Sequence, residues 1–112
     1  GDPTGDMAGD DAESLHWESA PLKRASQIIG FPSVKLKVSA SSPSAKWTVR
    51  LEDVAPDGTV ALVTGRLFNP AFLKDRLKPA LPAANEWYEL DGDLHFTTWT
   101  FKPGHKIRLS VS

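Results

Sequence analysis

The stretch FKPGHKIRLSVS, residues 101–112, combines a turn signal with a strict alternation of polar and apolar side chains. A Pro-Gly pair is typical of a tight turn, because proline presets φ and glycine tolerates the later turn positions. Every second residue from Ile107 to Val111 is apolar, which is the period of a half-buried strand. The stretch therefore predicts a turn followed by a final strand from His105 to Val111.

The same period of two recurs over most of the chain from Phe31 onward. We expect strands at 34–39, 47–52, 60–68, from 87, at 94–101 and at 105–111. Turn signals at 55–58 and at Asp91-Gly92 separate them, Gly65 suggests a bulge, and 69–84 fits helical turns or a long crossover loop. Such short strands predict an all-β fold, an antiparallel β-sandwich.

Length and composition indicate one domain of a globular protein. The 112 residues carry 40% hydrophobic and 24% charged residues and a net charge of −1, so nothing favours a nucleic-acid or membrane partner. There is no cysteine, and no apolar run reaches the ~18 residues of a membrane span. No targeting signal is visible, which leaves the location open and slightly favours the cytoplasm.

The first 14 residues differ from the rest of the chain. Residues 1–13 contain five acidic and no basic residues, hence a charge of −5, and little apolar content. Such a segment cannot bury enough surface to fold alone, so we expect an acidic linker or extended arm at 1–14 and a sandwich domain at 15–112. The aspartates do not follow the EF-hand pattern, and we predict no metal site and no cofactor.

Motifs of catalysis are missing from the sequence. There is no Gly-x-Ser-x-Gly elbow, no phosphate loop and no H-E-x-x-H pair. The three histidines, His16, His95 and His105, stand apart. A triad assembled from distant positions stays open, because triads are defined by geometry. We nevertheless predict no catalytic residue, and we do not expect this chain alone to be an enzyme.

Strand parity singles out His105 and Asp53. Counting back from Val111, His105 shares the inward face of its strand, and counting forward from Trp47, Asp53 is also inward. An unpaired buried polar group costs about 1 to 3 kcal/mol, so both side chains need partners. We predict a structural polar pair between them at one end of the sandwich; a solvated turn histidine is the alternative.

Trp17, Trp87 and Trp99 are the aromatic candidates for an interface or a ligand. Trp47 falls on the apolar face of its strand and is expected in the core. The other three favour packing or an interface with another domain. A platform for sugar rings is the alternative, because aromatic faces can stack on them.

Five motifs in order resemble a known family. They are W-x-S-A-P-L at 17–22, I-x-G-F-P-S-V-K-L-K-V-S at 28–39, V-R-L-E-D-V-A-P-D-G at 49–58, V-T-G-R-L at 63–67 and F-x-x-G-H-K-I-R-L-S-V-S at 101–112. Together they resemble the carboxy-terminal domain of X-Pro dipeptidyl-peptidase and cocaine-esterase-like serine hydrolases. The resemblance covers residues 15–112 apart from a nondescript stretch between Phe68 and Glu86.

The resemblance implies a galactose-binding-like jelly roll and an accessory role. In that family the jelly roll follows an α/β-hydrolase domain that carries the serine, aspartate and histidine of the reaction, packs on it and helps to wall the active site. No catalytic residue transfers to this chain. Family members usually continue past the last strand, so we expect an uncovered surface that a second copy or the segment 1–14 would cover. A carbohydrate-binding module is the second interpretation and a free-standing enzyme the third.

Overall fold

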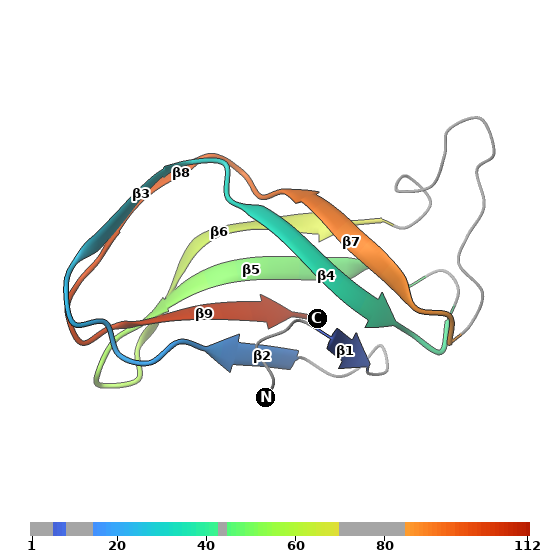
Figure 1. Cartoon of the computed structure of the whole chain (residues 1–112), viewed down its shortest axis with the longest axis horizontal. Helices are drawn as coiled ribbons and strands as arrows, with labels where there is room; N and C mark the ends of the chain where they lie inside the picture. The colour runs from blue at the N-terminus through green and yellow to red at the C-terminus, as the bar shows by residue number, and fades with distance from the viewer. Residues whose placement is uncertain (1–5, 9–14, 43–44, 70–84) are drawn as a thin grey trace.

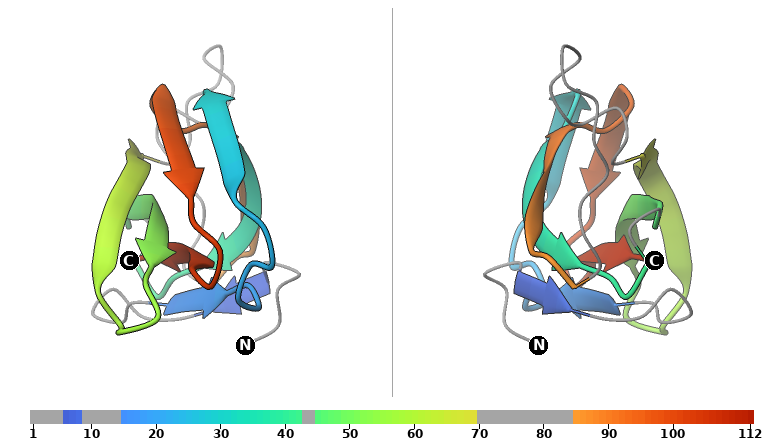
Figure 2. Two further views of the ribbon diagram at one scale, coloured as in Figure 1. Left: turned by 90° about the vertical axis from the view of Figure 1, so that its left-hand side faces the viewer. Right: turned by 90° about the vertical axis from the view of Figure 1, so that its right-hand side faces the viewer.

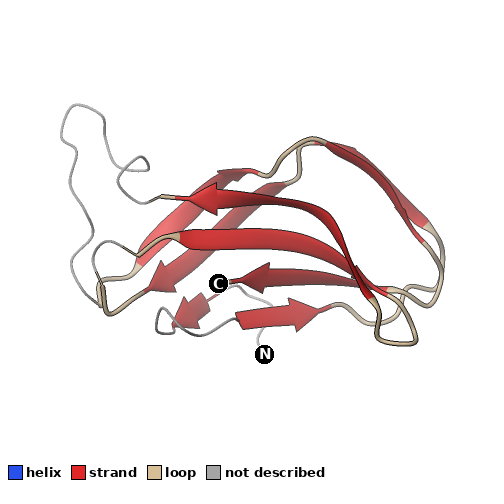
Figure 3. Cartoon of the chain, turned by 180° about the vertical axis from the view of Figure 1, so that it is seen from behind, coloured by secondary structure: helices blue, strands red, loops and turns tan. Residues whose placement is uncertain are grey.

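A computed structural model describes residues 6–8, 15–42, 45–69 and 85–112 of the protein. These residues form strands and no helix, as Figures 1 and 3 show, and so include no helix that could cross a membrane. The strands are β1 (Asp6–Ala8), β2 (Leu15–Glu18), β3 (Ser26–Gly30), β4 (Ser33–Ser39), β5 (Trp47–Val54), β6 (Val60–Phe68), β7 (Tyr88–Asp93), β8 (Thr97–Phe101) and β9 (Lys106–Val111).

The strands form a sandwich of two facing sheets with a short third sheet at one end (Figure 2). The first sheet has the order β2-β9-β5-β6, and the second has the order β1-β4-β7. All pairings among the described strands are antiparallel except that of β1 with β4. The prediction of an all-β, antiparallel sandwich is therefore confirmed, while its galactose-binding-like assignment stays a prediction.

The third sheet is the pair β3 and β8, which we call the arch. It continues the β4–β7 pair around a bend and lies across the end of the sandwich (Figure 1). At the bend, the Leu94 N–H donates to the Pro32 carbonyl over 2.7 Å. The Thr97 hydroxyl donates to the Val63 carbonyl over 3.1 Å, which attaches the arch to β6. The first bond holds the two chain segments together at the bend, and the second fixes the arch to the four-stranded sheet.

The core lies between the two large sheets and comes from the inward residues of both. Each strand contributes alternate residues, as the period of two requires. The members of this core are Leu36, Val38, Ala40, Trp47, Val49, Phe68, Leu90, Leu94 and Val111. Trp47 also donates its indole N–H to the Tyr88 hydroxyl over 2.6 Å, so the one polar atom of this buried ring is satisfied.

The sequence did not predict three of the strands, β1, β2 and β3, and one predicted turn was wrong. Leu15–Glu18 and Ser26–Gly30 are strands, although the expected strands began only after Phe31. The Asp91-Gly92 pair lies inside β7 and pairs with β4 instead of forming a turn. The reason is steric: a Cβ at Gly92 would lie 2.6 Å from Arg66 Nη1, so the glycine makes room for a crossing guanidinium.

Other expectations changed in detail. The predicted strand 94–101 begins only at Thr97, because the chain bends around the buried Leu94. The irregularity in the β5–β6 pairing lies opposite Leu51 and Glu52, not at Gly65. Most of the predicted crossover, 70–84, lies outside the described residues. Of the predicted arm, Asp6–Ala8 forms β1 beside Lys37–Ser39, and the rest of 1–14 also lies outside them.

Candidate functional site

Asp53 and His105 meet where β5 ends and β9 begins. His105 Nδ1 lies 2.7 Å from Asp53 Oδ1, and the two side chains are 19% and 7% exposed. An ionised carboxylate only accepts hydrogen bonds, so Nδ1 carries the proton in this contact. The structure thus brings together the two residues that strand parity selected.

Trp99 is the third member of this cluster. Its indole N–H donates to Asp53 Oδ2 over 3.0 Å, so each carboxylate oxygen accepts one side-chain hydrogen bond. Trp99 lies on β8, in the arch, whereas Asp53 lies on β5 in the four-stranded sheet. The Asp53 cluster, Asp53, Trp99 and His105, therefore joins the arch to that sheet.

Two tight turns position the cluster. In the β5–β6 turn, the Gly58 N–H donates to the Ala55 carbonyl over 2.8 Å. The Thr59 N–H donates to Asp57 Oδ1 over 2.9 Å, and this bond lowers the pKa of Asp57. This turn follows directly on Asp53 and β5 and so fixes the end of the strand that carries the carboxylate.

The second turn lies between β8 and β9. The His105 N–H donates to the Lys102 carbonyl over 3.1 Å, and Gly104 has φ +84°, a conformation that favours glycine. Leu22 brackets the turn from the loop after β2: its carbonyl accepts from the Gly104 N–H over 2.7 Å, and its N–H donates to the His105 carbonyl over 2.8 Å. His105 is consequently fixed by its backbone on both sides.

The cluster lacks the chemistry of a catalytic site. An indole N–H is a donor only, so Trp99 cannot take the place of the serine in a nucleophilic triad. Within the described part of the chain, no group of three or more His, Cys, Asp or Glu side chains could hold a metal ion. What the arrangement can do is satisfy a buried carboxylate and fix three chain segments against each other.

An apolar pocket of about 230 Å³ lies next to the Asp53 cluster. It lies between β3 and the strands β5, β8 and β9, and its walls include Ile28, Ile29, Phe31, Leu51, Phe101 and Ile107. Residues two apart on a strand share a face. Asp53 on β5 and Trp99 on β8 each stand two positions from a wall residue, Leu51 and Phe101, so the cluster borders the pocket.

A second polar cluster, the Glu52 cluster, lies on the other face of the four-stranded sheet. Arg108 Nε donates to Glu52 Oε1 over 3.0 Å, and the Ser110 hydroxyl donates to the same oxygen. Burial opposes the ionisation of Glu52, but the bonds from Ser110 and Arg108 outweigh it and lower its pKa. The sequence interpretation missed this cluster, although Glu52 and Arg108 share the outward parity of adjacent strands.

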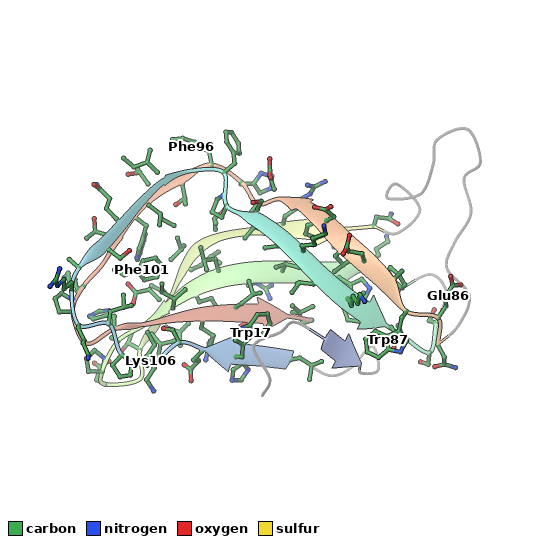
Figure 4. The ribbon with its side chains drawn as sticks, viewed as in Figure 1. Trp17, Glu86, Trp87, Phe96, Phe101 and Lys106 are labelled. Atoms are coloured by element: carbon green, nitrogen blue, oxygen red, sulfur yellow. The ribbon has the colours of Figure 1, made fainter. Side chains whose placement is uncertain are left out.

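The three candidate tryptophans do not gather at one place. Trp17 lies on β2, opposite Leu109, and packs against the core. Trp87 is 49% exposed and lies just before β7, on the side of the molecule away from the arch (Figure 4). Trp99 belongs to the Asp53 cluster. The sequence left the parity of Trp99 ambiguous, and the structure places it on the same face of β8 as the buried Thr97 and Phe101.

The sequence pattern of one protein family covers nearly the whole chain. It is described as the X-Pro dipeptidyl-peptidase C-terminal non-catalytic domain, and it matches residues 5–112. The chain belongs to this family. It is therefore a non-catalytic domain of a serine hydrolase family, which agrees with a cluster that contains no nucleophile.

Relatives and solved structures place this non-catalytic domain within much longer chains. Cocaine esterase from Rhodococcus sp. (strain MB1 Bresler) is 31% identical over 98 residues, which are 88% of this chain and 17% of the esterase. An aminopeptidase from the marine sediment archaeon Thaumarchaeota archaeon superposes with a TM-score of 0.80 at 27% identity, over 88% of this chain and 18% of its own.

A third comparison concerns the fold alone. A CocE/NonD family hydrolase from Staphylococcus aureus superposes with a TM-score of 0.77 at 11% identity, over 91% of this chain and 23% of its own. The chain therefore spans about a fifth of the length of the proteins it matches. The domain is an accessory part of such hydrolases.

Proposed function

We propose that this non-catalytic domain packs on an α/β-hydrolase domain in the same polypeptide and helps to wall its active site. The observation that carries the proposal is the family match over residues 5–112, in proteins of which the chain spans about a fifth. The hydrolase domain would carry the serine, aspartate and histidine of the reaction. Its substrates would be acyl-proline peptides or small esters and amides, in keeping with the esterase and aminopeptidase among the similar proteins.

The test compares this chain with the longer polypeptide that its gene encodes. We expect no turnover of an X-Pro p-nitroanilide or a p-nitrophenyl ester by residues 1–112. We expect turnover by the longer polypeptide, and its loss when the serine of a Gly-x-Ser-x-Gly elbow is replaced by alanine. Turnover by the 112-residue chain that persists through exhaustive purification would refute the accessory role.

For the Asp53 cluster we propose a structural role, as a polar pin between the arch and the four-stranded sheet. Three observations support it: the burial of Asp53, the bonds of 2.7 and 3.0 Å to His105 and Trp99, and the origin of the three residues in separate segments. A buried carboxylate with both oxygens bonded fixes its donors in one geometry, because any other arrangement leaves it unpaired.

The alternative of a carbohydrate-binding module has less support. A sugar platform needs accessible aromatic faces, and of the three candidates only Trp87 is exposed, at 49%. Titration of the chain with oligosaccharides, followed by tryptophan fluorescence, tests it: a saturable change would favour this alternative.

A homodimer formed through an uncovered surface is a further expectation, and sedimentation equilibrium of the chain measures it directly.

A further inference from the structure

The outside of the bend carries an exposed apolar patch that adjoins the apolar pocket. Ile29 and Phe31, which line the pocket, are 69% and 63% exposed, and Phe96 is 58% exposed. The rings of Phe31 and Phe96 pack edge to face with centroids 5.5 Å apart. Phe96 lies at the top of the arch in Figure 4. We call these three residues and the pocket the arch patch.

The arch patch is suited to protein packing rather than to a small ligand. Sites for small molecules usually have a volume of about 300 to 1,000 Å³ and a few polar groups that orient the ligand. This pocket measures about 230 Å³, and the residues that line it are isoleucine, leucine, phenylalanine, proline and glycine. It therefore offers apolar contact without polar recognition, which a large apolar side chain of another protein segment would match.

The three exposed side chains of the arch patch are far fewer than the roughly 20 to 30 residues that each side of a stable interface between separate chains contributes. A stable interface between separate chains buries about 800 Å² on each partner. A partner in the same polypeptide needs less area, because the covalent connection supplies a high effective concentration. The described part of the predicted arm does not compete for the patch, since Asp6–Ala8 pairs with Lys37–Ser39, at the end of β4 that points away from the arch (Figure 1).

We propose that the arch patch receives large apolar side chains from the catalytic part of the same polypeptide, so that the arch is the docking surface of this domain. The inference rests on the proposed function and adds which surface of this domain contacts the catalytic part. The chain spans about a fifth of its relatives, so the greater part of such a polypeptide is available as the occupant. The Asp53 cluster next to the pocket would keep the arch rigid for this contact.

Backbone hydrogen exchange compares the 112-residue chain with the longer polypeptide. We expect exchange in residues 28–31 to slow by about tenfold or more in the longer polypeptide, because docking suppresses local opening. Phe31→Ser in the longer polypeptide should abolish this slowing. The matched control is Leu67→Ser on β6, where a leucine is 58% exposed, and it should leave the slowing intact. Urea unfolding of both variants in the 112-residue chain shows whether each still folds.

Three other outcomes would contradict the inference, and a second variant covers a failure to fold. If Phe31→Ser unfolds the chain, Phe96→Ser takes its place in the same comparison. Slowing confined to the strand of Leu62 and Leu67 would reject the arch as the docking surface and leave the proposed function standing. No slowing anywhere in residues 15–112 would reject both. Slowing at 28–31 in the 112-residue chain that grows with its concentration would identify a second copy as the occupant.

Discussion

Asp53 Oδ1 and His105 Nδ1 lie 2.7 Å apart although 52 positions separate the two residues in the sequence. Asp53 lies buried near the end of β5, just before one tight turn, and His105 ends the other tight turn, just before β9. The contact therefore joins the end of β5 to the start of β9, and Trp99 extends it to the arch. Changes at the Asp53 cluster should therefore affect both the stability of the domain and the position of the arch, its proposed docking surface.

Asp53→Ala should destabilise the domain by about 1 to 3 kcal/mol, because it leaves a half-buried indole N–H and an imidazole without their acceptor. Chemical denaturation at neutral pH measures the change in the free energy of unfolding. Asp91→Ala, at an exposed strand position of β7, serves as the control and should change it by less than about 0.5 kcal/mol. Equal effects of the two substitutions would contradict the structural role of Asp53.

Trp99→Phe keeps the aromatic ring but removes the donor to Asp53. We expect a loss of about 1 kcal/mol or somewhat more, because a bond to a charged acceptor is stronger than a neutral one. In a double-mutant cycle with Asp53→Asn the two losses should not add, since both break the same contact. The same cycle between Trp17→Phe and Asp53→Asn is the control and should be additive within about 0.5 kcal/mol.

Alanine at Gly65 should cost more than alanine at Gly92. A Cβ at Gly65 would lie 2.9 Å from the carbonyl oxygen of Val49, in the backbone of a central strand that cannot easily move. At Gly92 the nearest atom is Arg66 Nη1, at the end of a flexible side chain, although Phe68 Cε1 follows at 3.1 Å. Overpacking costs about 1 to 3 kcal/mol, and we place Gly65→Ala at the upper end of that range. Thermal unfolding compares the two, and the reverse order would show that β5 yields more readily than the guanidinium.

Glu52 should give the domain a pH-dependent stability in the acid range. Its pKa is lowered in the fold from the usual 4.5, so between the two values the unfolded chain binds more protons than the folded one. The stabilisation is complete above the unfolded value and is lost as pH falls through the folded value. Glu52→Gln should therefore cost about 1 to 2 kcal/mol at pH 7 and progressively less below pH ~4.5.

The control for this pH dependence is Glu89→Gln on an exposed position of β7. Denaturation at several pH values gives the difference between each variant and the unaltered chain. A Glu52→Gln difference that stays constant down to the pH of acid unfolding would contradict the assigned hydrogen bonds of the Glu52 carboxylate.

Much of the fold was readable from the sequence, because a strand with one buried face shows its period of two directly. That period located β4, β5, β6 and β9, and parity selected Asp53 and His105 as inward polar residues. The prediction from the sequence was wrong where the structure of a segment depends on a side chain from a distant part of the chain. The Asp91-Gly92 pair predicts a turn by its residue types, and only the fold shows that Arg66 crosses Gly92.

The sequence by itself determined the family, the β-sandwich class and the absence of a nucleophile elbow, because these depend on motifs and on local periodicity. Only the tertiary structure decided that Trp99 completes the Asp53 cluster, since the parity of one strand does not say which strand faces it. It also decided the bend that turns β3 and β8 into an arch and exposes Phe31 beside Phe96. The sequence of one strand shows which of its side chains share a face, but a contact also depends on which other strand the fold places opposite that face.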